Sequence, residues 1–321
     1  MSTPLSSSLS SASWPAPPES IWRRASDFLS GRRGFYLALL LAPPLLWLGV
    51  VYLGSLFALL AHSFFSIDEF SGLIVYEPTF KTILELFRPA NFDIIIRTLS
   101  MAMVVTLASV IIAFPIAYYA ARFAKGPMKA LFYFAVMLPL WSSYLVKLYA
   151  WKLILAKEGI ISWTFASLGM SSVLEAILAT PTIGGPSLST SYIGCFLVFT
   201  YIWLPYMILP MQASLERVPK SMIEASGDLG AKPRQTLFQV ILPLALPGIV
   251  AGSIFTFSLT LGDYIIPQIV GPSPLFIGQA VYTLQGTAGN IPLAASFSVV
   301  PIIIMSIYLL IARRMGAFDA L

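Results

Sequence analysis

Six long apolar stretches, separated by short polar segments, dominate the chain. A helix needs about 20 apolar residues to cross the hydrocarbon core of a bilayer, and each stretch reaches that length. A backbone inside hydrocarbon has no water to bond, so each stretch is predicted to be a membrane-spanning helix, kinked where prolines interrupt it. The six predicted spans cover residues 35–61, 94–121, 130–153, 192–213, 237–261 and 292–312.

Composition also indicates an all-α integral membrane protein. Of the 321 residues, 58% are hydrophobic and 10% are charged, whereas a soluble domain is about one quarter charged. This balance excludes a disordered chain and a soluble nucleic-acid binder, so no nucleic-acid partner is expected. Cys195 is the only cysteine and His62 the only histidine, which excludes an intrachain disulfide and sites that need several histidines. We expect Cys195 to pack in the core and His62 to lie at an interface, with no catalytic or metal-binding residue and no enzymatic activity.

The basic residues predict the orientation of the spans. With the N-terminus inside, 13 of the 19 Lys and Arg residues fall on the cytoplasmic side, in agreement with the positive-inside rule. Both termini are therefore predicted to be cytoplasmic. The other six, on the outer side or near outer helix ends, are Lys81, Arg88, Arg97, Lys147, Lys152 and Lys157.

Three regions are predicted along the chain. Residues 1–34 are rich in serine and proline and are expected to form a disordered cytoplasmic tail. The apolar run that follows is too long for the core of a signal peptide. Residues 35–315 are predicted to form the six-helix transmembrane domain, and residues 316–321 a C-terminal tail.

Two outer segments leave alternatives open. Between the first two spans, Phe80, Ile83, Leu84 and Phe87 recur at helical spacing. This pattern predicts a short helix that lies on the membrane surface or packs on its neighbours. The loop between the third and fourth spans ends in Gly and Pro at residues 182–186, and it either contacts an external partner or caps the bundle.

The connection between the fourth and fifth spans has the most specific pattern. After Pro219, which suits a first helical turn, the apolar residues Met222, Ala225 and Leu229 fall on one side of a short helix. Gly227 and Gly230 weaken and end it. The pattern predicts a helix-turn-helix with a small apolar knob flanked by charges, suited to a groove on a soluble partner. An ordinary amphipathic loop is the alternative.

The same connection resembles a known signature. Glu224, Ala225, Ser226 and Gly230, followed by Val240, Leu242 and Pro243, resemble EAA-x3-G-x9-I-x-LP. That signature marks permease subunits of binding-protein-dependent ABC importers of the type I (MetI-like) fold, and here serine and valine are mild departures from it. The resemblance implies a cytoplasmic coupling helix within a coupling loop at residues 215–236, seated in a cleft of the ATPase. The implied coupling residues are Met222, Glu224, Ala225, Ser226, Gly227, Asp228, Leu229 and Gly230.

Further segments are similar to the first permease subunit of spermidine/putrescine importers. They are residues 138–151, 201–210 and 262–271, although that family usually has arginine where this chain has Lys147. The resemblance implies transport of a polyamine or related organic cation. Another small solute, such as an amino acid derivative, an organic acid, iron or an oxyanion, is the alternative. A stand-alone secondary carrier and an integral-membrane enzyme are further alternatives, although no internal repeat or catalytic cluster supports them.

The resemblance also implies partners. The chain has no GxxxxGK[ST] phosphate loop, so it is expected to bind no cofactor itself, with ATP and Mg²⁺ held by separate ATP-binding subunits. Six spans make half a pathway in this family, which implies a second permease subunit, expected to be a different chain. A periplasmic or surface solute-binding protein would deliver the solute, and the expected location is the bacterial inner membrane, in contact with lipid.

Charges and aromatic residues near the outer helix ends are pathway candidates. Asp263 could attract a cation, and aromatic rings could face its ammonium groups. The alternatives for Asp263 are a water-exposed helix end or a partner for Lys147, and an interfacial aromatic belt is the alternative for the rings. Lys147 is expected to pair with an acid or to extend outward. The aromatic candidates are Trp141, Tyr149, Trp151 and Tyr264.

Overall fold

The computed structural model describes residues 33–68 and 70–314, which fall into two compact units that divide after Ala58. The first unit holds α2 (Arg33–Leu46), η1 (Trp47–Leu53) and the start of α3 (Gly54–His62). Together these elements correspond to the first predicted span, and the apolar window from Leu37 to His62 buries none of its residues. The π-helical η1 follows Pro43 and Pro44, which lack the N–H groups of regular α-helical bonding. The predicted tails lie outside the described residues, except that α2 already begins at Arg33.

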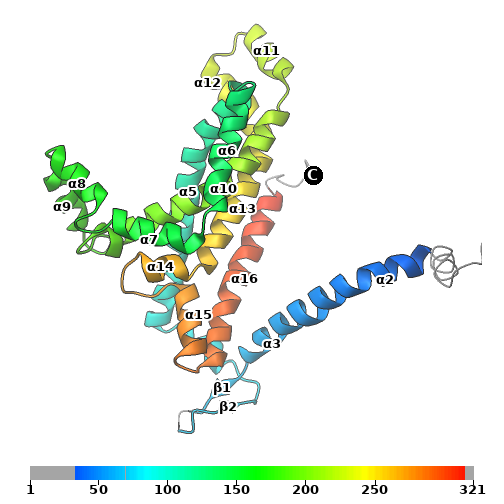
Figure 1. Cartoon of the computed structure of the whole chain (residues 1–321). Helices are drawn as coiled ribbons and strands as arrows, with labels where there is room; N and C mark the ends of the chain where they lie inside the picture. The colour runs from blue at the N-terminus through cyan, green and yellow to red at the C-terminus, as the bar shows by residue number, and fades with distance from the viewer. Residues whose placement is uncertain (1–32, 69, 315–321) are drawn as a thin grey trace, which may run out of the picture. The chain divides into compact units, whose positions relative to one another are not determined.

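The second unit is built around α10 (Tyr192–Arg217). This helix packs against α5 (Pro89–Arg122) and α13 (Leu242–Gly262), and α13 also contacts α16 (Ile291–Arg314) (Figure 1). More of α10 is buried than of any other candidate span, 56% of its apolar window. Small side chains on α5 and α13 pack against larger ones on α10, which places the core along α10. That core includes Ala113, Ala117, Met207, Met211, Leu215 and Ala245.

The α10–α13 contact is a close approach of two backbones. A Cβ atom added to Gly248 would come within 2.5 Å of the Pro210 carbonyl oxygen. One added to Gly252, a turn further along α13, would come within 3.0 Å of the Met207 carbonyl oxygen. Small residues spaced four apart allow this approach in membrane helices, where packing rather than hydrophobic exclusion holds helices together.

The third predicted span is bent. Residues 130–153 were expected to form one helix, but α6 (Pro127–Trp141) and α7 (Tyr144–Ile154) meet at 94°. Ser142 and Ser143 are extended at the break, and the Ser142 hydroxyl donates to the Pro139 carbonyl. Pro139 cannot donate a backbone bond, so the helix has a weak point there. Within the described residues, five helices are long and apolar enough to span a membrane, and this bent pair makes up to six.

Short elements join the long helices. At one end of the second unit lie α11 (Lys220–Asp228) and α12 (Pro233–Thr236), followed by π-helical η3 (Leu237–Ile241); α14 (Ile265–Ile269) and α15 (Ile277–Gly286) lie towards the other end (Figure 1). β1 (Ser66–Ile67) and β2 (Ile74–Val75) form a small antiparallel hairpin, with Ser66 opposite Val75. The remaining elements are α4 (Lys81–Glu85), α8 (Ile160–Ser167), α9 (Ser171–Leu178) and η2 (Leu188–Thr190).

The predicted surface helix is present in part, as α4. Its apolar residues Phe80, Leu84 and Phe87 are exposed, whereas Thr82 and Leu86 are buried. The face that packs on the protein is therefore not the apolar stripe that the spacing indicates. An outward apolar stripe favours the membrane-surface interpretation over a helix packed on its neighbours.

Candidate functional site: the coupling loop

The coupling loop leaves α10 at Arg217 and returns to the bundle through η3. Pro219 stands in the N-cap position of α11 with an extended backbone, and Pro233 opens α12. The N–H of Lys232 donates to the side-chain carbonyl of Gln235, 2.8 Å away, which fixes the start of α12. The predicted helix-turn-helix is thus present. Pro233 lies in the first turn of α12, which its fixed φ suits, whereas Pro219 precedes the first turn of α11.

The turn between α11 and α12 depends on Gly230. Its φ of +80° lies in the left-handed region, as its predicted role in the turn requires. The N–H of Gly230 donates to Gly227 at 2.8 Å, and the N–H of Ala231 donates to Ser226 at 3.0 Å. This pair of bonds is the Schellman arrangement, which satisfies the last carbonyls of a helix and sets the exit direction of the chain.

One face of α11 holds the helix to the bundle. Ile223 packs on the core cluster around α10, and the Ser226 hydroxyl lies 2.9 Å from the Thr236 hydroxyl in α12. The serine that departs from the EAA signature therefore makes a bond that alanine could not. Ile223 was not among the predicted coupling residues, because its place in the helical spacing does not distinguish it from the exposed knob.

The other face of α11 is open. Met222, Ala225 and Leu229, the predicted apolar knob, are all exposed, Leu229 at 89%. Glu224 and Asp228 are exposed beside them. α11 is thus fixed on one face and exposes three apolar and two acidic side chains on the other. Such a surface is suited to dock into a groove lined with apolar and basic groups.

A second polar cluster lies where α6 and α10 meet near the loop. Glu216 accepts bonds from Lys129 at 3.0 Å, from Tyr133 at 3.0 Å and from Gln212 at 3.2 Å. Nearby, the Arg122 guanidinium donates to the Val218 carbonyl at 2.9 Å. These contacts fasten the loop's first residues to α5 and α6. Except for Gln212, one turn before Glu216, the partners are far apart along the chain, so these contacts could not be predicted from the sequence.

Asp263, the predicted pathway acid, accepts hydrogen bonds at both of its carboxylate oxygens. One carboxylate oxygen accepts the N–H groups of Ile265 and Ile266, at 2.7 and 2.9 Å, and so caps α14. The other accepts the hydroxyl of Tyr144 in α7. Both oxygens are therefore engaged, and Asp263 ties α13, α14 and α7 together rather than presenting a free carboxylate.

The aromatic pathway candidates differ in their exposure and in their ring partners. Trp141 and Tyr149 are well exposed, and Trp141 meets Phe134 edge to face. Trp151 is half-buried and packs on Tyr201. Tyr264 stacks on Tyr282 of α15, with ring centroids 4.9 Å apart.

Three single residues complete the comparison with the expectations. The Lys147 ammonium donates to the Pro139 carbonyl at 2.6 Å, across the α6–α7 bend, so its observed partner is a main-chain oxygen instead of an acid. Cys195 is fully buried in a core cluster, as expected of a packing residue. His62 ends α3 and meets Phe65 edge to face. Across residues 33–68 and 70–314, His, Cys, Asp and Glu form no group of three that could hold a metal.

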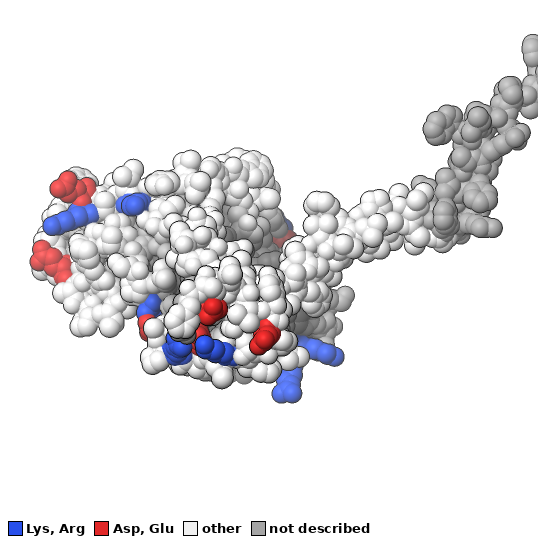
Figure 2. All heavy atoms as spheres, turned by 90° about the horizontal axis from the view of Figure 1, so that it is seen from below, with Lys and Arg blue, Asp and Glu red and all other residues white. Residues whose placement is uncertain are grey.

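The face opposite the coupling loop carries both signs of charge. Viewed from that end of the second unit, acidic and basic side chains lie together in small groups (Figure 2). Wide uncharged areas separate one group from the next. Such mixing produces no strong field of one sign, so a charged solute would not be attracted over a long range by this face alone.

Comparison with known proteins identifies the family. The family described as "Binding-protein-dependent transport system inner membrane component" matches residues 187–317, which include the coupling loop. The Escherichia coli K12 inner membrane ABC transporter permease protein YdcU is 57% identical over 298 residues, covering 93% of this chain and 95% of the relative. The chain belongs to the ABC transporter permease family.

More distant relatives agree with this assignment. The spermidine/putrescine permease protein PotB of E. coli K12 is 27% identical over 282 residues and covers 88% of this permease and 94% of the relative. PotC of the same organism is 29% identical over 126 residues, covering 38% and 47%. The resemblance to the polyamine permeases noted from the sequence is confirmed at the level of whole chains.

Solved structures confirm the type I, MetI-like fold. A bacterial ABC transporter involved in the import of the acidic polysaccharide alginate matches with a TM-score of 0.63 at 16% identity, covering 91% of this permease and 98% of that chain. The MetNI methionine transporter matches with a TM-score of 0.50 at 20% identity, covering 71% and 97%. The permease is thus a multi-pass inner-membrane transport subunit and not the catalytic one. Permeases of this family work with a separate ATPase, a second permease and a binding protein.

Proposed function

We propose that this permease forms one half of the translocation pathway for a polyamine or a related small organic cation. We also propose that α11 couples the pathway to ATP hydrolysis on a separate subunit. The observation that carries the coupling role is the two-faced geometry of α11. Ile223 and Ser226 hold one face to the bundle, and Met222, Ala225 and Leu229 leave the other face open.

The acidic residues of α11 support the same role. Glu224 and Asp228 are four residues apart and lie exposed on the same face, next to Ala225, so a cleft with basic groups would find two carboxylates beside an apolar knob. The Schellman turn at Gly230 keeps the knob at a fixed angle to α12 and to the helix that follows it. A push on α11 is thereby passed to α13 rather than absorbed in a flexible loop.

The solute class rests on the relatives. Whole-length likeness to PotB, a spermidine/putrescine permease, supports a polyamine or a similar cation. Within the permease, the exposed rings of Trp141, Tyr149 and Tyr264 are the proposed faces for an ammonium group. We assign Asp263 and Trp151 to positioning these segments, because the contacts of Asp263 are structural and Trp151 is packed on Tyr201.

Co-purification tests the coupling proposal. The ATP-binding subunit should co-purify with the wild-type permease and be lost with Glu224→Lys, which reverses a charge on the open face of α11. Glu77→Lys is the matched control, because Glu77 is equally exposed but lies beyond β2, outside the coupling loop. Retention of the ATPase by Glu224→Lys, or active uptake by the permease alone in vesicles, would contradict the proposal.

Loading of the binding protein tests the solute class. The assembled transporter in proteoliposomes should hydrolyse ATP faster when its binding protein carries putrescine or spermidine. The comparison set is the same binding protein offered an amino acid derivative, an organic acid, ferric iron or an oxyanion. If one of these solutes and no polyamine stimulated ATP hydrolysis, the permease would be assigned to that solute class instead. The proposed coupling role would not be affected.

A further inference from the structure

A cavity of about 690 Å³ lies between α5 and α10, in the halves of these helices that are away from the coupling loop. Its volume is within the range of sites that hold small organic ligands, about 300–1,000 Å³. Asp93, Arg97 and Ser100 line one side, and the segment at Thr182 and Ile183 faces them. No residue of this cavity belongs to the coupling loop or to the proposed pathway faces.

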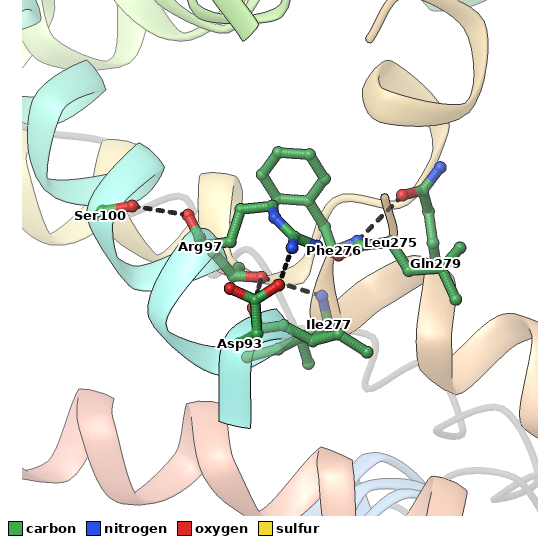
Figure 3. A network of polar contacts seen from close by, with 9 residues as sticks. Asp93, Arg97, Ser100, Leu275, Phe276, Ile277 and Gln279 are labelled. Atoms are coloured by element: carbon green, nitrogen blue, oxygen red, sulfur yellow. Dashed lines mark hydrogen bonds and ion pairs between the residues drawn. The ribbon is translucent and has the colours of Figure 1, made fainter. Parts of the chain in front are cut away.

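The polar end of the cavity holds a balanced pair of charges. Arg97 is paired with Asp93 one turn earlier, and its guanidinium also donates to the Leu275 carbonyl at 2.8 Å (Figure 3). The Asp93 side chain is 63% exposed, while that of Arg97 is 17% exposed. The guanidinium also contacts the neighbouring Tyr192 phenol. Because a guanidinium has five N–H donors, these three contacts still leave donors for a ligand.

The arginine is held in place by its surroundings. Next to it, Thr98 accepts the N–H of Ile277 at 3.0 Å, and Gln279 accepts the N–H of Phe276 at 3.0 Å (Figure 3). These bonds fix the start of α15 against α5, and with it the Leu275 carbonyl that orients Arg97. A fixed guanidinium loses little conformational entropy when it binds an anion.

The rest of the cavity is apolar. Ile96, Val104, Ile193 and Phe196 form its wall. Ile96 and Val104 are about half exposed, and the exposed stripe continues along α5 to Leu107 and Ile111. The cavity is therefore polar at one end and opens along an apolar helix face at the other.

Helix length places these two ends relative to the bilayer. α5 has 34 residues, so it is about 51 Å long, against about 30 Å of hydrocarbon. With Arg122 at one membrane interface, about 20 residues of helix cross the hydrocarbon, which brings the other boundary near Ala102. Asp93 and Arg97 then lie at the level of the lipid headgroups, and Val104 lies at the level of the acyl chains.

We propose that this cavity binds a phospholipid with a zwitterionic headgroup, of the phosphatidylethanolamine type, in the leaflet away from the coupling loop. Arg97 and Tyr192 donate to its phosphate, and the exposed carboxylate of Asp93 accepts its ammonium. One acyl chain lies along Ile96, Val104 and Phe196. The pairing of one acid with one base suits this headgroup, because an anionic lipid would place an unbalanced negative charge beside Asp93 and a free polyamine would place positive charges beside Arg97.

Lipid retention by the purified, assembled transporter tests the proposal. After exchange into nanodiscs with equal amounts of phosphatidylethanolamine and phosphatidylglycerol, native mass spectrometry should find phosphatidylethanolamine retained preferentially. Arg97→Gln should lower its retention about tenfold, the effect of one lost charge-assisted hydrogen bond. Asp93→Asn should remove the preference between the two lipids.

Two further variants guard against indirect effects. Val104→Trp fills the apolar end without touching the polar bonds and should also lower retention. Arg88→Gln is the control, since Arg88 is a neighbouring exposed base outside the cavity lining, and it should leave retention unchanged. The proposal is overturned by equal retention of both lipids in the wild type, by retention that survives both Arg97→Gln and Val104→Trp, or by cross-linking of Val104→Cys to the second permease.

Discussion

The hydroxyl groups of Ser226 in α11 and Thr236 in α12 lie 2.9 Å apart and join the two helices of the coupling loop. Ser226→Ala restores the EAA signature but removes this bond. We expect it to lower the free energy of unfolding by about 1 kcal/mol and to weaken the coupling of ATP hydrolysis to uptake. The measurements are thermal unfolding of the solubilised permease and the ratio of solute imported to ATP hydrolysed. Ser221→Ala, at an exposed position of the same helix, should change neither.

Gly230→Val should disturb the turn after α11. Its φ of +80° is unfavourable for a β-branched residue, at a cost of about 1–3 kcal/mol, although a Cβ there would meet no neighbouring atom. We expect ATP hydrolysis to persist while uptake falls. Gly286→Ala is the matched control, because Gly286 ends α15, outside the coupling loop, and a Cβ there would also meet no neighbouring atom. Normal uptake by Gly230→Val would show that the turn does not need the left-handed conformation.

The ion pair of Lys129 with Glu216 should contribute a measurable coupling energy. A double-mutant cycle of Lys129→Met and Glu216→Gln is expected to give about 0.2–1 kcal/mol, the range of partly exposed pairs. The readout is unfolding of the solubilised permease. Lys125→Met, at an exposed lysine beside the start of α6, is the control and should leave stability unchanged. A coupling energy of zero would mean that Tyr133 and Gln212 alone hold Glu216.

Substitutions at Asp263 and Tyr144 distinguish two roles for Asp263: positioning of the neighbouring helices, and electrostatic attraction of a cationic solute. Asp263→Asn keeps an oxygen that can accept the N–H groups of Ile265 and Ile266, so we expect cation uptake to be largely retained. Asp263→Ala loses this cap, at a cost of about 0.5–2 kcal/mol, and should lower both stability and uptake. Tyr144→Phe removes the bond from α7 without altering charge, and a smaller loss of the same kind is expected. Strong loss of uptake by Asp263→Asn with unchanged stability would restore a direct role for the negative charge.

Hydropathy and one motif were enough to predict five of the spans and the helix-turn-helix between α10 and α13. The long apolar runs admit few alternatives in a bilayer, and Gly230 has a local conformational reason to be glycine. The split of the third span was not predicted, because Ser142 and Ser143 lie in an apolar context where composition alone favours a continuous helix. A proline such as Pro139 within a span predicts a kink, but it does not by itself indicate a bend of 94°.

Contacts between residues that are distant in the sequence could not be predicted either. Nothing in the sequence joins Lys129 to Glu216 or Arg97 to Leu275, since such pairs depend on how helices pack. For Asp263, the sequence predicted a pathway role but not the bonds that its carboxylate accepts from the first N–H groups of α14. The exposed faces of Met222, Ala225 and Leu229 were predictable because helical spacing alone determines which side chains share a face.

The close approach of α10 and α13 at Gly248 and Gly252 affects how force travels through the permease. The coupling loop leaves one of these helices and leads into the other, and their backbones touch about midway along α13. α10 and α13 are therefore connected twice, through the coupling loop that contains α11 and at the glycine contact. We expect a displacement of α11 to be passed through the glycine contact to the end of α13 at Asp263, with α14, on the far side of the membrane.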